Sequence, residues 1–100
     1  MGQPYTHGMW TVKPGHEEQF VAAWTELAEW TNRDVPGSVW ARLLRDNSAP
    51  NHFVSFGPWD SLDAIENWRA LPGWQERVQR LRELLDGFKP STLELVAELE

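Results

Sequence analysis

The chain has 100 residues and a formal net charge of −6, enough for one hydrophobic core, so we expect a single domain over residues 1–100. It has no cluster of Lys and Arg, which argues against nucleic-acid binding, and no cysteine, which excludes disulfides and thiolate catalysis. No apolar run is long enough to span a membrane, and residues 1–8 lack the features of a signal peptide, so we expect a cytoplasmic protein.

The N-terminal third predicts a strand followed by a helix. Residues 5–12 alternate in character and predict a strand with Gly8 and Trp10 on one face and His7 and Met9 on the other. A turn at Lys13-Pro14-Gly15 ends this strand. Residues 17–31 predict a helix, because acidic residues suit its first turn and apolar residues recur at helical spacing, namely Phe20, Trp24, Leu27 and Ala28.

A hairpin is predicted next. After a loop at residues 32–37, residues 38–45 predict a second strand and residues 52–57 a third. The segment between these strands, residues 46–51, is rich in turn-forming residues and short enough for a hairpin. The second and third strands are therefore expected to pair in the antiparallel direction.

A broken helix and a last strand complete the chain. The helix begins at Asp60 or Ser61 and is interrupted at Pro72-Gly73. It is expected to stop at Asp86-Gly87, with Gly87 as a left-handed cap. Residues 91–99 predict the last strand.

The order β-α-β-β-α-β predicts an α+β fold of the ferredoxin-like kind, with a four-stranded antiparallel sheet and the helices on one face. The uncovered face should be polar if it meets water. Instead, at least three strands carry large apolar residues on both faces, for example Met9 beside Trp10 and Leu43 beside Leu44. We therefore expect a homodimer formed through the sheet.

Three motifs resemble those of a known family. They are V-K-P-G at residues 12–15, P-G at residues 36–37 and W-D-S-L-D-A at residues 59–64. Together with the element order, they resemble the antibiotic biosynthesis monooxygenase-like domain of the dimeric α+β barrel proteins, over residues 5–99. The resemblance implies a homodimer whose two sheets pack into a barrel, with a pocket between sheet and helices in each protomer. Some members of the family oxidise polycyclic aromatic substrates with O₂ and without a cofactor, and others degrade haem.

The site residues of the family carry over only in part. Its haem-degrading members use an Asn in the first strand, a Trp in the second helix and a His further along that helix. Trp68 matches the Trp, but Gly8 stands at the Asn position and Val78 at about the His position. The resemblance therefore does not support haem degradation by that mechanism. For the cofactor-free oxygenases, the resemblance suggests residues of suitable type at Asn67, Trp68, Arg42 and Tyr5.

Seven tryptophans are a large number for 100 residues, and Trp is enriched in aromatic pockets and interfaces. We predict a Trp-lined pocket with substrate-binding residues Trp10, Arg42, Trp68 and Trp74. Each Trp has an alternative role in core packing. Gly8, on the same strand face as Trp10, leaves room for a ligand or instead marks a bulge.

His7 and His52 are candidate general bases, because histidine titrates near neutral pH. The alternative is that both histidines are hydrogen-bonded at the dimer interface. With Asn67 and Trp68 they form the predicted catalytic set. Asn67, Arg42, His7 and His52 are the candidate polar groups for substrate deprotonation or enolate stabilisation. No His pair or His-carboxylate cluster has metal-ligand spacing, so no metal or other cofactor is expected.

These observations lead to one hypothesis and two alternatives. The hypothesis is a cofactor-independent monooxygenase that acts on a hydrophobic aromatic or quinol-type small molecule. The first alternative is a non-catalytic dimeric module that binds a hydrophobic ligand or a partner protein. The second is haem binding with His7 or His52 as a substitute ligand.

Overall fold

The structure, a computed structural model of the chain, describes residues 2–100. Four strands and three helices follow one another along the chain. The strands are β1 (Pro4–Val12), β2 (Arg42–Asp46), β3 (Ala49–Pro58) and β4 (Leu85–Glu94), and the helices are α1 (Glu17–Asp34), α2 (Leu62–Ala70) and α3 (Pro72–Arg82).

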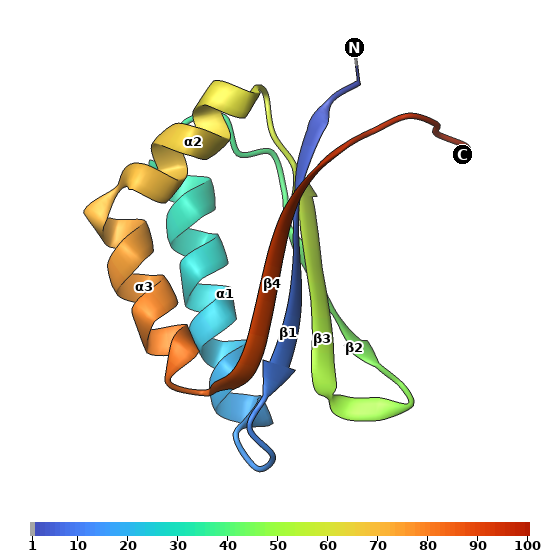
Figure 1. Cartoon of the computed structure of the whole chain (residues 1–100). Coiled ribbons are helices and arrows are strands. Elements are labelled where there is room, and N and C mark those ends of the chain that lie inside the picture. The colour runs from blue at the N-terminus through green and yellow to red at the C-terminus, as the bar shows by residue number, and fades with distance from the viewer. Residues whose placement is uncertain (1) are drawn as a thin grey trace.

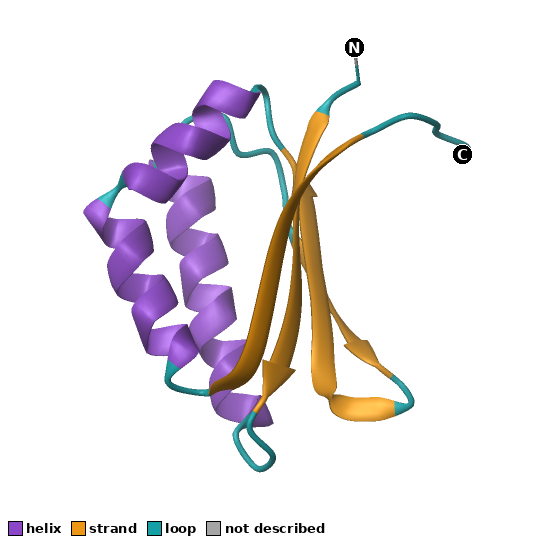
Figure 2. Ribbon diagram, viewed as in Figure 1, coloured by secondary structure: helices purple, strands orange, loops and turns teal. Residues whose placement is uncertain are grey.

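The strands form one antiparallel sheet in the order β2-β3-β1-β4. All three helices lie on one face of this sheet, and the other face is uncovered (Figures 1 and 2). This arrangement confirms the predicted ferredoxin-like α+β fold. No helix within residues 2–100 is long and apolar enough to cross a membrane.

The core lies between the sheet and the helices because strand alternation directs one set of side chains toward the helix layer. On β1 this set includes Trp10 and Val12, and across the ladder Phe53 of β3 pairs with Trp10. From the helices, Phe20 and Leu81 complete the same buried cluster. The helix-facing side of β1 is therefore the side that carries Thr6 and Gly8, while His7 and Met9 belong to the uncovered side.

The predicted break in the second helix is confirmed. Leu71 has an extended backbone (φ −71°, ψ 138°) and separates α2 from α3. Pro72 enforces this conformation, because a proline disfavours helical geometry in the residue before it and is well tolerated at the first position of a helix. Ser61 caps α2, as its side-chain oxygen accepts a hydrogen bond from the backbone N–H of Ala64.

Several predicted boundaries are wrong. The third strand begins at Ala49, inside the turn expected over residues 46–51, and the first helix continues to Asp34 rather than residue 31. The strand expected over residues 38–45 begins only at Arg42. The helix expected to stop at Asp86-Gly87 ends at Arg82, and Gly87 lies in β4 without a positive φ angle. The last strand, expected over residues 91–99, spans Leu85–Glu94 instead.

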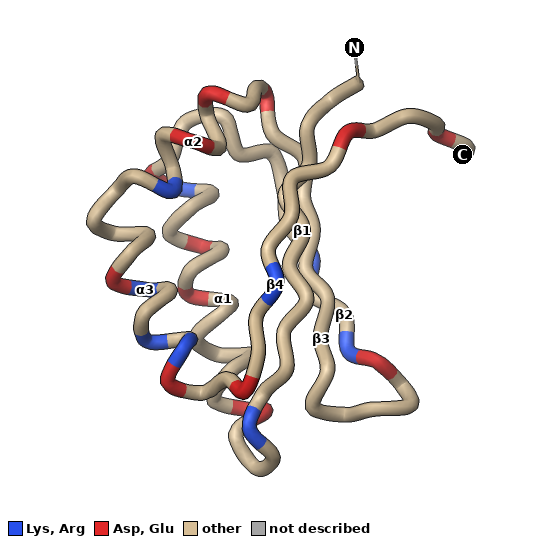
Figure 3. The backbone as a smooth tube through the Cα atoms, viewed as in Figure 1, with Lys and Arg blue, Asp and Glu red and all other residues tan. Residues whose placement is uncertain are grey.

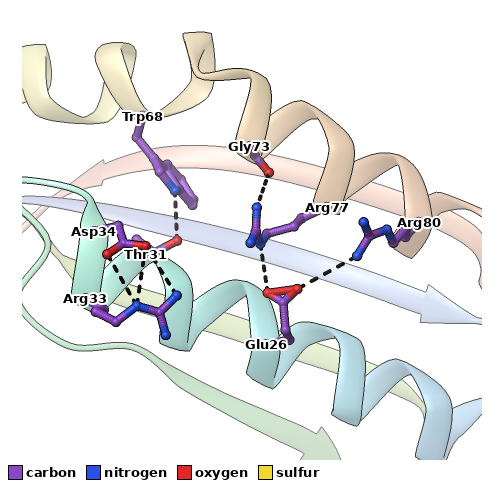
Figure 4. A network of polar contacts seen from close by, with 8 residues as sticks. All are labelled: Glu26, Thr31, Arg33, Asp34, Trp68, Gly73, Arg77 and Arg80. Atoms are coloured by element: carbon purple, nitrogen blue, oxygen red, sulfur yellow. Dashed lines mark hydrogen bonds and ion pairs between the residues drawn. The ribbon is translucent and has the colours of Figure 1, made fainter.

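Polar contacts tie α3 to α1 (Figure 4). Arg77 of α3 donates from Nε to Glu26 Oε2 of α1 at 2.7 Å and from Nη1 to the carbonyl oxygen of Gly73 at 3.0 Å. Its guanidinium also lies 4.3 Å from the ring centre of Trp30. Acidic positions are spread over the helices and the C-terminal segment (Figure 3), so the negative charge has no single focus.

Candidate active site

A cavity of about 380 Å³ lies between the sheet and the helices. Its wall includes residues of all three helices and of β1, β3 and β4, together with the segment before β2. The cavity therefore runs across the sheet from the β4 edge to the β2 edge. Six of the seven tryptophans border it, namely Trp10, Trp24, Trp40, Trp59, Trp68 and Trp74.

Trp68 is the centre of an aromatic cluster on the helix side of the cavity. Its ring centre is 4.8 Å from that of Trp59 and 5.8 Å from that of Trp74, the latter in an edge-to-face arrangement. Its indole N–H donates to Thr31 Oγ1 of α1 at 3.0 Å (Figure 4). The N–H of Trp59 likewise donates to Thr6 Oγ1 at 3.1 Å. These bonds fix the orientation of two cavity walls before any ligand arrives.

Trp10 forms the sheet side of the cavity together with Gly8. Its indole N–H donates to Ser55 Oγ of β3 at 2.9 Å, and its ring stacks on Phe88 of β4 at 4.1 Å between centres. A Cβ atom at Gly8 would lie 2.9 Å from this indole nitrogen and 3.0 Å from the Ser55 oxygen. Glycine is therefore required at position 8 for Trp10 to reach Ser55.

Three cavity tryptophans keep their indole N–H groups available. Within residues 2–100, Trp24, Trp40 and Trp74 donate no side-chain hydrogen bond to the protein, and no buried polar side-chain atom lacks a partner. Their N–H groups can therefore donate to a ligand or to water. The ring of Trp40 also packs against Tyr5 and Phe56 at the edge of the sheet.

Arg69 is the one arginine or lysine among the described residues that borders the cavity. It follows Trp68 in α2 and donates from Nη1 to Thr92 Oγ1 of β4 at 3.4 Å. Burial lowers the pKa of the Arg69 guanidinium, and no carboxylate acts against this effect. Arg69 was not among the residues predicted from the sequence, because an arginine in the last turn of a helix is usually a solvated residue that interacts with the negative helix end.

The predicted site residues separate into two groups. Trp10, Trp68 and Trp74 border the cavity, and so does His7, although strand alternation directs the His7 side chain toward the uncovered face. Arg42, His52 and Asn67 do not border it. The Arg42 guanidinium lies 4.2 Å from the ring centre of Trp40, and the side chains of all three residues are exposed.

The residues compared with those of haem-degrading proteins do not fit a haem. Gly8, at the Asn position, and Val78, at about the position of the axial His, both border the cavity, and the Val78 side chain cannot ligate iron. Strand alternation places His7 on the uncovered face, and His52 does not border the cavity. Within residues 2–100, no group of three or more His, Asp or Glu side chains is arranged to hold a metal ion.

The sequence profile of the family described as antibiotic biosynthesis monooxygenase matches residues 5–86. No curated protein matches the chain closely enough to count as a relative. SnoaB, a cofactor-independent oxygenase from Streptomyces nogalater, has a similar structure, with a TM-score of 0.90 and 24% identity over 99% of this chain and 98% of its own.

Two further solved structures are similar. A protein from Deinococcus radiodurans, described provisionally as an antibiotic biosynthesis monooxygenase, has a TM-score of 0.84 and 24% identity, covering 97% of this chain and 96% of its own. One from Nitrosomonas europaea with the same provisional description has a TM-score of 0.84 and 17% identity, covering 96% and 93%. At these identities the three likenesses establish the fold.

Proposed function

The chain belongs to the antibiotic biosynthesis monooxygenase family, and on this premise we propose that it is a cofactor-independent monooxygenase for a hydrophobic aromatic or quinol-type small molecule. The observation that carries the proposal is the cavity of about 380 Å³ with six tryptophans in its wall. Pockets of this size whose walls are largely aromatic suit flat apolar ligands, with a small number of polar groups to orient them. The similar Streptomyces nogalater protein, itself a cofactor-independent oxygenase, supports the same reaction class.

In the proposed reaction the substrate supplies the electrons. A CH₂ group between two electron-rich rings loses a proton and becomes a carbanion. The carbanion forms a C–O bond with O₂, and the resulting peroxide takes up a proton. Loss of water then leaves a carbonyl, so one oxygen atom enters the product and the other leaves as water.

The residues of the cavity support three roles in this reaction. Trp68 and Trp74 would hold the rings of the substrate from the helix side, and Trp10 would hold them from the sheet side. Water exclusion by these walls strengthens electrostatic stabilisation of the anion. Among the described residues of the wall, Glu29 is the carboxylate that can accept the proton, whereas the His7 side chain is directed toward the other face.

Oxygen uptake with 1,8-dihydroxyanthrone, measured with EDTA present and no cofactor added, tests the proposal. We expect protein-dependent uptake of one O₂ per substrate oxidised. Trp68→Phe shortens the wall and removes the N–H bond to Thr31, so kcat/KM should fall about tenfold, equivalent to about 1.4 kcal/mol of transition-state stabilisation.

Trp30→Phe is the matched control, because Trp30 is the tryptophan that does not border the cavity and packs against Arg77 instead. This variant should keep the rate of the unchanged protein. Two outcomes would count against catalysis in the cavity. One is O₂ uptake by the unchanged protein no faster than by Trp68→Ala, and the other is an equal fall in kcat/KM in Trp68→Phe and Trp30→Phe.

One observation favours a non-catalytic binding module as the second candidate. His52 and Asn67, two of the residues predicted to be catalytic, lie outside the cavity wall, and the His7 side chain is directed away from it. A binding module would bind anthraquinones in calorimetric titrations and yet leave the rate of anthrone oxidation at its uncatalysed value.

We also propose that the chain forms a homodimer through the uncovered face of the sheet. Leu44 of β2, Val54 of β3 and Met9 of β1 are paired in register and form an apolar row over three strands of this face, with Lys89 of β4 at its end. Met9 is 51% exposed and Leu44 is 52% exposed, and Leu93 of β4 extends the same face with 47% exposure. A second copy that covered this row would remove its apolar surface from water.

A further inference from the structure

Arg69 stands at the β4 end of the cavity with most of its hydrogen-bonding capacity unused. A guanidinium has five N–H donors in a planar fork. Within residues 2–100, the Arg69 side chain makes one hydrogen bond, the 3.4 Å bond from Nη1 to Thr92 Oγ1. Its position in the last turn of α2 favours the positive charge, because the carbonyl end of a helix is negative.

The half-buried position of Arg69 has a cost that no carboxylate of the described residues offsets. Burial lowers the pKa of its guanidinium, and no carboxylate lies within ion-pair distance of it among the described residues. Among the Arg and Lys side chains of residues 2–100, Arg69 and Arg77 are the two that are not exposed, and Arg77 is paired with Glu26 whereas Arg69 has no carboxylate partner. The chain holds 15 acidic residues against 9 basic ones. A carboxylate partner would thus be easy to supply, and its absence at the cavity indicates a position kept for a ligand.

We propose that Arg69 is an anion-binding subsite that takes a carboxylate group of the ligand and thereby sets the direction in which the ligand lies in the cavity. The inference rests on the proposed function, since it takes the cavity to be the substrate site. Arg69 and Trp68 are consecutive in α2. Trp68 is bonded to Thr31 on α1, and Arg69 is bonded to Thr92 on β4. A ring system against Trp68 therefore brings a ring substituent toward the guanidinium.

The opposite end of the cavity reinforces this direction. Glu29 and Asn32 of α1 border it there, and Asn32 Oδ1 accepts a hydrogen bond from Ser38 Oγ at 3.3 Å, in the segment before β2. A carboxylate on the ligand would be repelled by Glu29 and attracted by Arg69. The cavity thus fits an aromatic acid whose acidic end lies at β4 and whose neutral or hydroxylated end lies near α1.

A matched pair of probes tests the subsite by binding rather than by turnover. Anthraquinone-2-carboxylate and its methyl ester share the ring system and differ in charge, and each can be titrated by quenching of tryptophan fluorescence. The unchanged protein should bind the acid more tightly than the ester. Arg69→Gln should weaken binding of the acid at least about tenfold, the order expected for a hydrogen bond to a charged group, and change binding of the ester less than about twofold.

Arg82→Gln is the matched control, because Arg82 is exposed at the end of α3, outside the cavity wall, and the substitution removes the same charge. It should leave both affinities unchanged. The affinity of Arg69→Lys for the acid should lie between those of the unchanged protein and of Arg69→Gln, because lysine keeps the charge and loses the planar fork. Thermal unfolding of each variant shows whether it is folded.

The outcomes separate this inference from the proposed function. If the acid and the ester bind the unchanged protein equally, or if Arg69→Gln weakens both to the same extent, the anion subsite is overturned while the cavity remains a candidate oxygenase site. Binding of both probes with the expected difference but no O₂ uptake would support the subsite and contradict catalysis. Binding of neither probe overturns both.

Discussion

Thr31 shows how one hydroxyl group holds the cavity wall in place. Among residues 2–100, Thr31 is the one polar residue that is buried, with 6% exposure. Its Oγ1 atom accepts a hydrogen bond from the indole N–H of Trp68 at 3.0 Å. Thr31→Val keeps the shape of the side chain and removes the acceptor, which leaves the indole N–H of Trp68 without a partner. We expect the free energy of unfolding to fall by about 1–2 kcal/mol, measured by urea denaturation.

Thr25→Val makes the same chemical change six residues earlier in α1. Thr25 is exposed, and its hydroxyl donates to the carbonyl oxygen of Val21 within the helix. The free energy of unfolding of Thr25→Val should therefore stay within about 0.5 kcal/mol of that of the unchanged protein. Equal losses in the two variants would show that the Thr31 effect comes from helix propensity rather than from the bond to Trp68.

Residues of an unusually abundant type could be assigned to the cavity wall from the sequence, whereas residues of an ordinary type could not. The surplus of tryptophan pointed to Trp10, Trp68 and Trp74, which all border the cavity. Arg69 was missed because its distinguishing features are burial and the lack of a carboxylate partner, and both exist only in three dimensions. Arg42 and His52 lie on strands with apolar residues on both faces, so alternation alone could not tell the helix side from the uncovered side.

At the scale of elements, α2 carries the central tryptophan of the site and depends on its N-terminal cap. Ser61 Oγ accepts the backbone N–H of Ala64 at 3.1 Å. Ser61→Ala removes this acceptor from a helix of nine residues, so the free energy of unfolding should fall by about 1 kcal/mol. Ser48→Ala is the control, because Ser48 is exposed in the β2–β3 turn and uses its backbone N–H to bond Asp46. If the free energy of unfolding fell as much in Ser48→Ala as in Ser61→Ala, the Ser61 cap would not be the cause of the loss.

The two misplaced strands have physical causes. Residues 87–90 (Gly-Phe-Lys-Pro) resemble a turn in the sequence, yet they lie in β4 because this strand is at the sheet edge, where a proline without an N–H is tolerated. On the other side, Pro58 would pair with Trp40 if the β2–β3 register continued. Proline cannot donate to that ladder, and the chain before Arg42 keeps only an isolated bridge between Ser38 and Trp59.

For the whole molecule, the two faces of the sheet differ in what covers them, and the topology explains this difference. Because both crossovers place their helices on the same side, β1 and β3 contribute Gly8 and Ser55 to the cavity and Met9 and Val54 to the uncovered face. The sequence predicted both the fold and the apolar uncovered face, since these follow from element order and strand composition. The position of the cavity depends on how Trp10 and Trp68 are oriented by their hydroxyl partners, which no local pattern specifies.

The proposed dimer leads to a prediction at this scale. Met9→Lys and Leu44→Lys place charges at two ends of the apolar row, and burying an unpaired ammonium at an interface is strongly unfavourable. The double variant should be a folded monomer, whereas the unchanged protein should be a dimer at micromolar concentration in sedimentation velocity. Leu62→Lys is the control, because Leu62 is equally exposed, at 56%, but lies at the start of α2 on the helix side. An unchanged protein that sediments as a monomer, or a control variant that dissociates like the double variant, would contradict association through the sheet face.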